Sequence, residues 1–194
     1  ALYRDDRKSG QWLRTFMLEE CPAGIIAARR TIAVAFLTFA IPAAAGFLLL
    51  RERPTLAEEL LPAVMLERGE AGLERQAAGR GYFEADPEAR PLMASSIMTN
   101  NISVAFNCFA GGIFAGVGSL VLLAFNGLAI GAISSHFANL GLFGYLWTFI
   151  IGHGVLELFA IWVAGAAGFL LGKALLAPGD LPRGEALVLA GRLA

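Results

Sequence analysis

The chain of 194 residues is 57% hydrophobic and only 16% charged, and its formal net charge is −1. Soluble domains carry about 25% charged residues, so this composition excludes an ordinary soluble domain and indicates a membrane protein. A net charge near zero provides no basic field for nucleic acid, and the sequence has no G-x-x-x-x-G-K-[ST] phosphate loop. We therefore expect neither nucleic-acid binding nor nucleotide binding.

Residues 1–30 are predicted to form a cytoplasmic segment that lies on the bilayer surface. Four apolar residues recur at the spacing i, i+1, i+4, i+5, beside charged residues such as Arg14 and Glu19. An apolar stripe of this kind is typical of an interfacial amphipathic helix. We expect Cys21 and Pro22 to interrupt this helix. The stripe consists of Trp12, Leu13, Phe16 and Met17.

Residues 31–50 form the first predicted transmembrane helix. The run holds twenty uncharged residues, and at 1.5 Å of rise per residue it matches a hydrocarbon core of about 30 Å. Arginines mark both of its boundaries, where long basic side chains can reach the lipid headgroups. They are Arg29 and Arg30 at one end, and Arg51 and Arg53 at the other.

Residues 51–98 are predicted to form an extracytoplasmic loop with nine acidic and six basic side chains. Apolar residues recur at roughly helical spacing in its first part, which predicts a short amphipathic helix at the membrane surface. Pro62 limits the regularity of that helix. We favour a role in capping the helix bundle over a role in docking a partner. The apolar positions are Leu56, Leu60, Leu61, Val64 and Met65.

No charged residue occurs from Thr99 to Phe137, and these thirty-nine residues are nearly twice as long as one crossing requires. We predict two transmembrane helices, at 99–115 and 119–137, joined by a turn at Gly116 to Ser119. A less favoured alternative makes 99–111 a re-entrant or interfacial helix that breaks at Gly111 and Gly112.

Residues 144–176 form the fourth predicted transmembrane helix, with a break or bend near 152–154, and residues 177–194 form a tail. Nine Lys and Arg lie on the terminal side of the membrane against six in the loop, so the positive-inside rule places both termini in the cytoplasm. The predicted fold is all-α: a polytopic bundle of about four transmembrane helices, with an interfacial N-terminal helix and a partly helical external loop.

Three pairs of glycines in these helices have G-x-x-x-G spacing, which lets helices approach closely in lipid. Such faces can pack within one chain or across a homodimer, and we favour contacts within the chain. The pairs are Gly112 with Gly116, Gly127 with Gly131, and Gly168 with Gly172.

Polar residues form a second pattern inside the predicted helices. Asn100, Ser103 and Asn107 fall at i, i+3 and i+7 and share one helix face, beside Asn101, and Asn126 lies in the next helix. The simplest role for each asparagine taken alone is an interhelical hydrogen bond. Taken together, these residues suggest a polar seam between the helices. A helix-capping role is also open to Asn100.

His153 and Glu157 lie four residues apart in an otherwise apolar helix, where an ionisable side chain costs about 2.5–3.5 kcal/mol. Three hypotheses follow. The pair could bind a metal or act in catalysis, but the one other histidine is His136, so too few ligands are present. It could carry protons or ions. Or Glu157 could satisfy the start of a helix that resumes after a break. We favour the last and expect no metal, no cofactor and no catalytic residue.

The order of motifs along the chain resembles the stage II sporulation protein M family of bacterial integral membrane proteins. The likeness runs from about residue 30 onward. The motifs are Met98 to Phe106 (M-T-N-N-I-S-V-A-F), Phe109 to Gly112 (F-A-G-G), Gly116 to Ser119 (G-V-G-S), Asn126 with Gly127, and Gly152 to Leu158 (G-H-G-V-L-E-L).

The resemblance implies a multi-pass protein of the bacterial cytoplasmic membrane. The sporulation member acts in a membrane complex with peptidoglycan-degrading proteins, so membrane or envelope protein partners are implied, besides the bilayer itself. Family members commonly continue into further spans after a basic segment like Arg183 to Arg192, so we expect that one or both ends of a longer protein are missing here.

Three classes of function are open to such a chain. We favour a non-enzymatic subunit or scaffold of an envelope complex, with a homodimer as one form. The alternative is a transporter or channel subunit in which His153 and Glu157 form a buried proton or ion site. An intramembrane hydrolase is less favoured, because no nucleophile, base and orienting residue occur at usable spacing.

Overall fold

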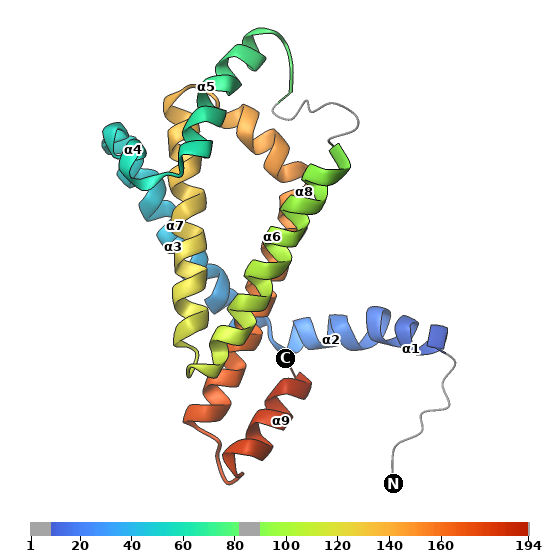
Figure 1. Cartoon of the computed structure of the whole chain (residues 1–194). Coiled ribbons are helices and arrows are strands. Elements are labelled where there is room, and N and C mark those ends of the chain that lie inside the picture. The colour runs from blue at the N-terminus through green and yellow to red at the C-terminus, as the bar shows by residue number, and fades with distance from the viewer. Residues whose placement is uncertain (1–8, 82–89, 194) are drawn as a thin grey trace.

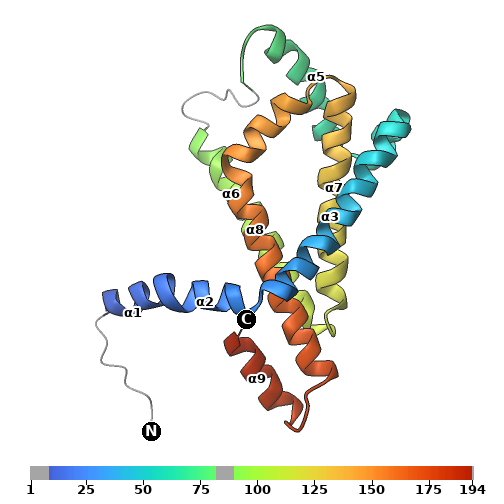
Figure 2. The same ribbon diagram turned by 180° about the vertical axis from the view of Figure 1, so that it is seen from behind.

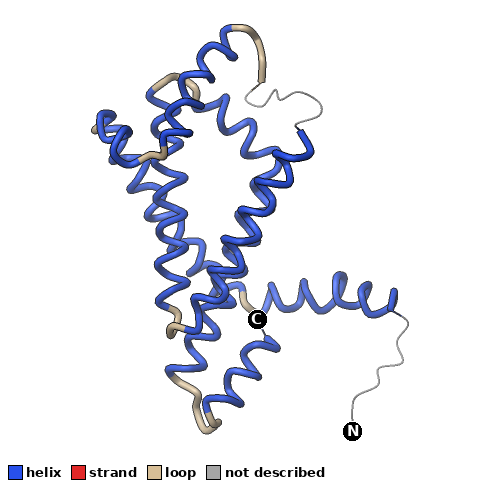
Figure 3. The backbone as a smooth tube through the Cα atoms, in the orientation of Figure 1, coloured by secondary structure: helices blue, strands red, loops and turns tan. Residues whose placement is uncertain are grey.

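The computed structural model describes residues 9–81 and 90–193, and these residues form helices and short connections with no strand (Figure 3). Four long helices make the bundle. Helix α3 lies beside α7, and α6 runs along α8 (Figures 1 and 2). The all-α membrane bundle predicted from the sequence is confirmed. The bounds are α3 Arg29–Glu52, α6 Arg90–Ala110, α7 Val117–Asn139 and α8 Phe143–Leu176.

Three segments of the described chain are long and apolar enough to cross a membrane: α3, α7 and the part of α8 from Gly154 to Leu176. The first part of α8, Phe143–Gly152, is a shorter apolar stretch. Helix α6 is not in this set, because its polar residues lower its mean hydropathy. A crossing by α6 stays a prediction.

The N-terminal segment is a helical rod that points away from the bundle (Figures 1 and 2). It joins α1 (Ser9–Thr15), the π-helical turn η1 (Phe16–Glu20) and α2 (Cys21–Ala27). The backbone stays helical at the predicted interruption, but its geometry changes there from π-helical to α-helical, since α2 begins at Cys21. Pro22 lies in the first turn of α2, directly after the junction at which the N–H of Cys21 donates to the carbonyl of Phe16. The predicted apolar stripe is exposed, with Met17 56% accessible.

The first part of the loop caps one end of the bundle. The single helix predicted around Pro62 is divided there: α4 (Ala57–Leu60) ends before Leu61, and α5 (Ala63–Ala77) follows. Leu61 and Pro62 are extended, since a proline disfavours helical backbone at the residue before it. Ala57 and Leu61 are buried against Leu50 and Ala132 in one apolar cluster. A short 3-10 turn, η2 (Pro54–Leu56), leads into α4.

The turn between α6 and α7 begins earlier than predicted. Helix α6 ends at Ala110, and the chain reverses through η3 (Gly111–Ile113) to Gly116, whose φ is +82°. Backbone contact explains the shift: a Cβ on Gly111 would lie 2.6 Å from the carbonyl carbon of Gly118. The helix predicted at 99–115 is therefore the last part of α6 and its turn.

Helix α8 is continuous over its 34 residues and changes direction in its first half, where a break or bend was predicted (Figure 2). The tail forms α9 (Arg183–Leu193), which folds back beside the end of α8.

Several glycines of the bundle lie in contact with backbone atoms of neighbouring segments. A Cβ on Gly127 would overlap the carbonyl oxygen of Phe39, and one on Gly131 would overlap that of Ala43. The other two pairs contact each other. A Cβ on Gly112 would be 2.6 Å from Cα of Gly168, and a Cβ on Gly172 would be 2.6 Å from Cα of Gly116. All three G-x-x-x-G pairs thus contact segments of the same chain.

A side chain at the α3–α7 crossing should separate the two helices. We expect Gly131→Ala to lower the free energy of unfolding in detergent by about 1–3 kcal/mol, because its Cβ meets rigid backbone. Thermal unfolding monitored by circular dichroism measures this. Gly144→Ala is the control, since nothing lies within 4 Å of its Cβ, and it should be neutral or stabilising. Equal effects of the two substitutions would contradict the packing described above.

Candidate functional site: a polar pair between α6 and α8

A hydrogen bond links an amide side chain of α6 to a carboxylate of α8. Asn101 Nδ2 donates to Glu157 Oε2. Both residues are half-buried. The two helices place them there because α6 runs along α8, so residues 56 positions apart become neighbours. The pair joins two of the candidate residues predicted from the sequence.

The pair lies at the edge of an apolar core. One turn after Glu157 on α8 is Ile161, which is 3% exposed, and two turns after Asn101 on α6 is the fully buried Cys108. These two belong to one buried cluster. A carboxylate in such surroundings loses hydration, and an amide N–H donor is a group that can replace part of it. The hydrogen bond therefore stabilises the carboxylate and links α6 to α8.

The helix-start hypothesis for Glu157 is wrong. Helix α8 has no end near residue 154, so no free N–H groups are present there for the carboxylate to accept. The partner of Glu157 is a side chain from another helix instead. The side chain of His153 lies outside the described part of the structure, so its relation to Glu157 remains a hypothesis.

The other predicted asparagines lie elsewhere. Asn126 donates to the carbonyl of Leu122 in its own helix, at 2.8 Å, and links no two helices. Asn100 and Asn107 are exposed on the outer side of α6. Ser103, on the same face, donates to the carbonyl of Thr99 at 2.8 Å. The polar face of α6 thus points away from the bundle, while Asn101, about 100° around the helix from Asn100, faces α8.

Three hydrogen bonds near the helix ends were not predicted from the sequence. Ser119, fully buried, donates to the carbonyl of Cys108 at 2.6 Å and ties the start of α7 to the end of α6. Arg51 Nη1 donates to Asn139 Oδ1 at 2.7 Å. Asn139 Nδ2 in turn donates to the carbonyl of Leu50 at 2.8 Å and joins the ends of α3 and α7. The sequence shows polar residues near the ends of the predicted helices, but their spacing does not indicate which of them bond to each other.

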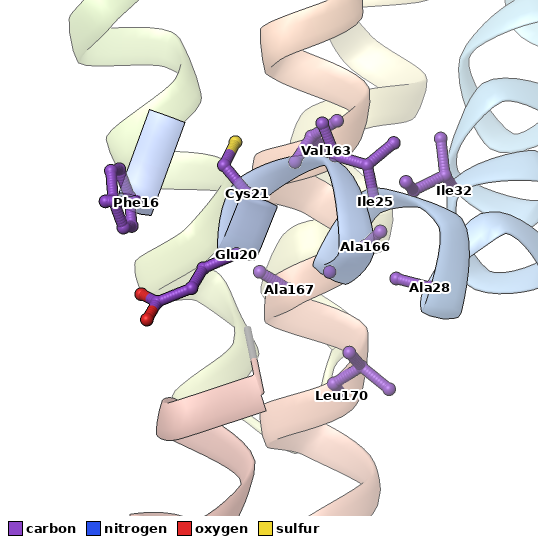
Figure 4. A pocket seen from close by; sticks show the side chains of 11 residues that line it. Phe16, Glu20, Cys21, Ile25, Ala28, Ile32, Val163, Ala166, Ala167 and Leu170 are labelled. Atoms are coloured by element: carbon purple, nitrogen blue, oxygen red, sulfur yellow. The ribbon is translucent and has the colours of Figure 1, made fainter. Parts of the chain in front are cut away.

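A cavity of about 260 Å³ lies where the N-terminal rod meets the bundle (Figure 4). Ile25 of the rod and Ala28, the residue that follows the rod, face Val163 and Ala166 of α8 across it. Glu20 also lines the cavity, but its carboxylate points away from α8 in Figure 4. The contact is apolar, and it anchors one end of the rod while the other end projects outward.

Metal binding finds no support among the described residues. No three His, Cys, Asp or Glu side chains of this part of the chain lie close enough together to hold an ion. The two cysteines, Cys21 and Cys108, form no disulfide.

These features define an all-α integral membrane protein whose long helices pack through glycines and share one polar pair. The family model for stage II sporulation protein M matches residues 35–194, and the chain belongs to that family. No curated protein and no solved structure gives a match to this chain.

Removing the amide donor should leave Glu157 without its interhelical partner. We expect Asn101→Ala to lower the free energy of unfolding in detergent by about 1–3 kcal/mol. Glu157→Gln keeps an acceptor oxygen and should cost less than Glu157→Ala. Denaturant titration of the purified variants measures these differences, and a double-mutant cycle gives the coupling.

Asn126→Ala is the matched control, because that amide bonds only to its own helix backbone. A loss in Asn126→Ala as large as in Asn101→Ala, or an absent coupling in the cycle, would argue against a link between α6 and α8.

Proposed function

We propose that this chain is a non-enzymatic integral membrane subunit, or scaffold, of a bacterial envelope complex in the cytoplasmic membrane, which it crosses several times. Membership of the stage II sporulation protein M family supports this assignment. The structural observation that carries it is the outward polar face of α6, formed by Asn100, Ser103 and Asn107.

Amides are poor groups to leave in contact with hydrocarbon, because lipid tails offer no hydrogen-bond partner. Neither Asn100 nor Asn107 has a hydrogen-bond partner among the described residues. Exposed apolar side chains surround them, with Ile102 61% and Phe106 66% accessible. A face with this composition suits a transmembrane helix of a partner, whose polar groups could bond the amides across the contact.

The N-terminal rod supplies a second surface. Its apolar residues Trp12, Leu13 and Met17 are each more than half exposed, although the rod stands beside a tightly packed bundle (Figure 1). An amphipathic helix with such a stripe lies on a bilayer surface. In this proposal the rod rests on the cytoplasmic face of the membrane and fixes the orientation of α6 toward its partner.

Replacing the two exposed amides should release the partner without unfolding the bundle. We expect the amount of partner that co-purifies with the double variant Asn100→Leu/Asn107→Leu to fall at least about tenfold. Two interhelical hydrogen bonds of about 0.6 kcal/mol each are lost, together with shape complementarity. Mild-detergent purification from native membranes, followed by mass spectrometry of bound proteins and of the assembly mass, measures this.

The matched control is Asn126→Leu, which removes an asparagine that bonds within α7. Retention of every partner by the double variant would contradict the docking role of α6. A wild-type chain that purifies alone would contradict the subunit assignment, and a homodimer disrupted by the same variant would identify a second copy as the partner.

The second candidate is a transporter or channel subunit, and the half-buried Glu157 carboxylate in an apolar helix favours it. If Glu157 carries protons, Glu157→Gln should abolish pH-driven flux in proteoliposomes while folded yield is retained. Asn126→Ala serves as the control. Absence of flux in the wild type, or full flux in Glu157→Gln, would exclude a proton role for this residue.

A further inference from the structure

A second cavity, of about 460 Å³, lies between α3, α7 and α8. It is the size of a small-molecule site. No charged side chain lines it, and six aromatic rings do. Along α3 the lining extends from residue 36 to residue 47, a rise of about 16 Å. The rings are those of Phe36, Phe39, Phe47, Phe143, Trp147 and Trp162.

The cavity opens sideways toward the surroundings of the bundle. Phe36 is 42% exposed, Phe143 43% and Val155 55%, although all three line it. Phe36 and Val155 belong to segments that are long and apolar enough to cross a membrane, and Phe143 begins the shorter apolar stretch of α8. A molecule dissolved in the bilayer can therefore enter from the side.

Three hydrogen-bond donors of the lining have no partner in the described part of the chain. They are the hydroxyl of Ser134, which is only 3% exposed, and the indole N–H groups of Trp147 and Trp162. A buried donor that stays unpaired costs free energy, so most such groups in proteins are satisfied. The unpaired donors indicate that a ligand with an acceptor oxygen belongs in the cavity.

The donors also restrict the charge of that ligand. Aromatic rings can bind a cation, but N–H and O–H donors present positive ends and no carboxylate lines the cavity to offset them. Without a Lys or Arg in the lining, a phosphate or free carboxylate has no countercharge inside. The inserted part is therefore neutral, mostly hydrocarbon, and carries an acceptor.

The two ends of the cavity differ in depth. Phe47 lies four residues before Arg51, and Phe143 is the first residue of α8, so this end is near a boundary of the apolar region. The Phe143 and Trp147 rings are 5.9 Å apart. Ser134 also lines the cavity and lies toward this end, because it follows by three residues Gly131, which contacts Ala43 of α3. The other end is formed by Trp162, whose ring centroid lies 4.9 Å from that of Phe36 and 5.8 Å from that of Phe39.

We propose that this cavity binds one acyl chain of a glycerophospholipid. The ester carbonyl accepts hydrogen bonds from Ser134 and Trp147 at the boundary of the hydrocarbon region, where tryptophans are enriched in membrane proteins. The tail extends along α3 toward Trp162. The headgroup stays outside, at the end of the bundle that α4 and α5 cover. The N–H of Trp162 is not explained by this ligand.

Lipid retention by the purified full chain tests the proposal. After extensive detergent washing and organic extraction, mass spectrometry should recover about one phospholipid per wild-type chain. Ala44→Trp fills the cavity and should reduce retention at least about fivefold. Ala45→Trp is the matched control, since Ala45 is exposed on the same helix but does not line the cavity, and it should retain the lipid.

A pair of serine variants tests the acceptor contact without adding bulk. Ser134→Ala should reduce retention about fivefold, the effect of one lost hydrogen bond. Ser135→Ala should leave retention unchanged, because Ser135 is equally buried and its hydroxyl also lacks a partner, but it does not line the cavity. Thermal unfolding of each variant confirms that it is folded.

Three outcomes would overturn the proposal: no phospholipid above the amount bound by Ala44→Trp, equal losses in Ala44→Trp and Ala45→Trp, or recovery of a polyisoprenoid lipid in place of a phospholipid. The first two indicate lipid bound around the bundle only. The third indicates a ligand of another chemistry.

Discussion

Contact between glycines and backbone is the constraint on which the rest of this bundle depends. Lipid tails are as apolar as the helices, so burial of apolar surface gives little drive for association, and close packing must supply it. Gly127 and Gly131 hold α7 against Phe39 and Ala43 of α3. At the other end of α7, the turn glycines Gly112 and Gly116 hold α8. Helix α7 is therefore fixed on two sides.

Fixed helices determine where each polar residue points. Successive residues of a helix are separated by about 100°, so neighbouring asparagines of α6 have different surroundings. Asn101 meets Glu157 inside the bundle, whereas Asn100 and Asn107 face outward. One helix thus carries an internal link to α8 and an external polar face. A rotation of α6 by about 100° would exchange these two positions, and the contact of Gly168 with the carbonyl oxygens of Cys108 and Phe109 opposes such a rotation.

The sequence predicts the helices well, because uncharged length, flanking arginines and glycine spacing are local properties. It predicts the start of the turn between α6 and α7 poorly. Gly111 and Gly116 are equally flexible, and only the backbone contact of Gly111 with Gly118 makes the turn begin at Gly111. Asn101 and Glu157 were both candidates, but their pairing depends on how α6 crosses α8. The unpaired donors of Ser134, Trp147 and Trp162 carry no sequence signal, since each residue is ordinary in an apolar helix.

The aromatic cavity follows from the same contacts that close the bundle. Gly165, Gly168 and Gly172 bring the second half of α8 against the start of α7, with Leu123 and Ser119 as neighbours. Toward the other end of α7, α8 changes direction (Figure 2), and its residues Phe143 and Trp147 line the cavity. Two helices held tightly at one end and separated by tryptophan and phenylalanine at the other must diverge. The space between them is therefore a consequence of the packing that stabilises the fold, and Gly131 and Ala43, which contact each other, form part of its wall.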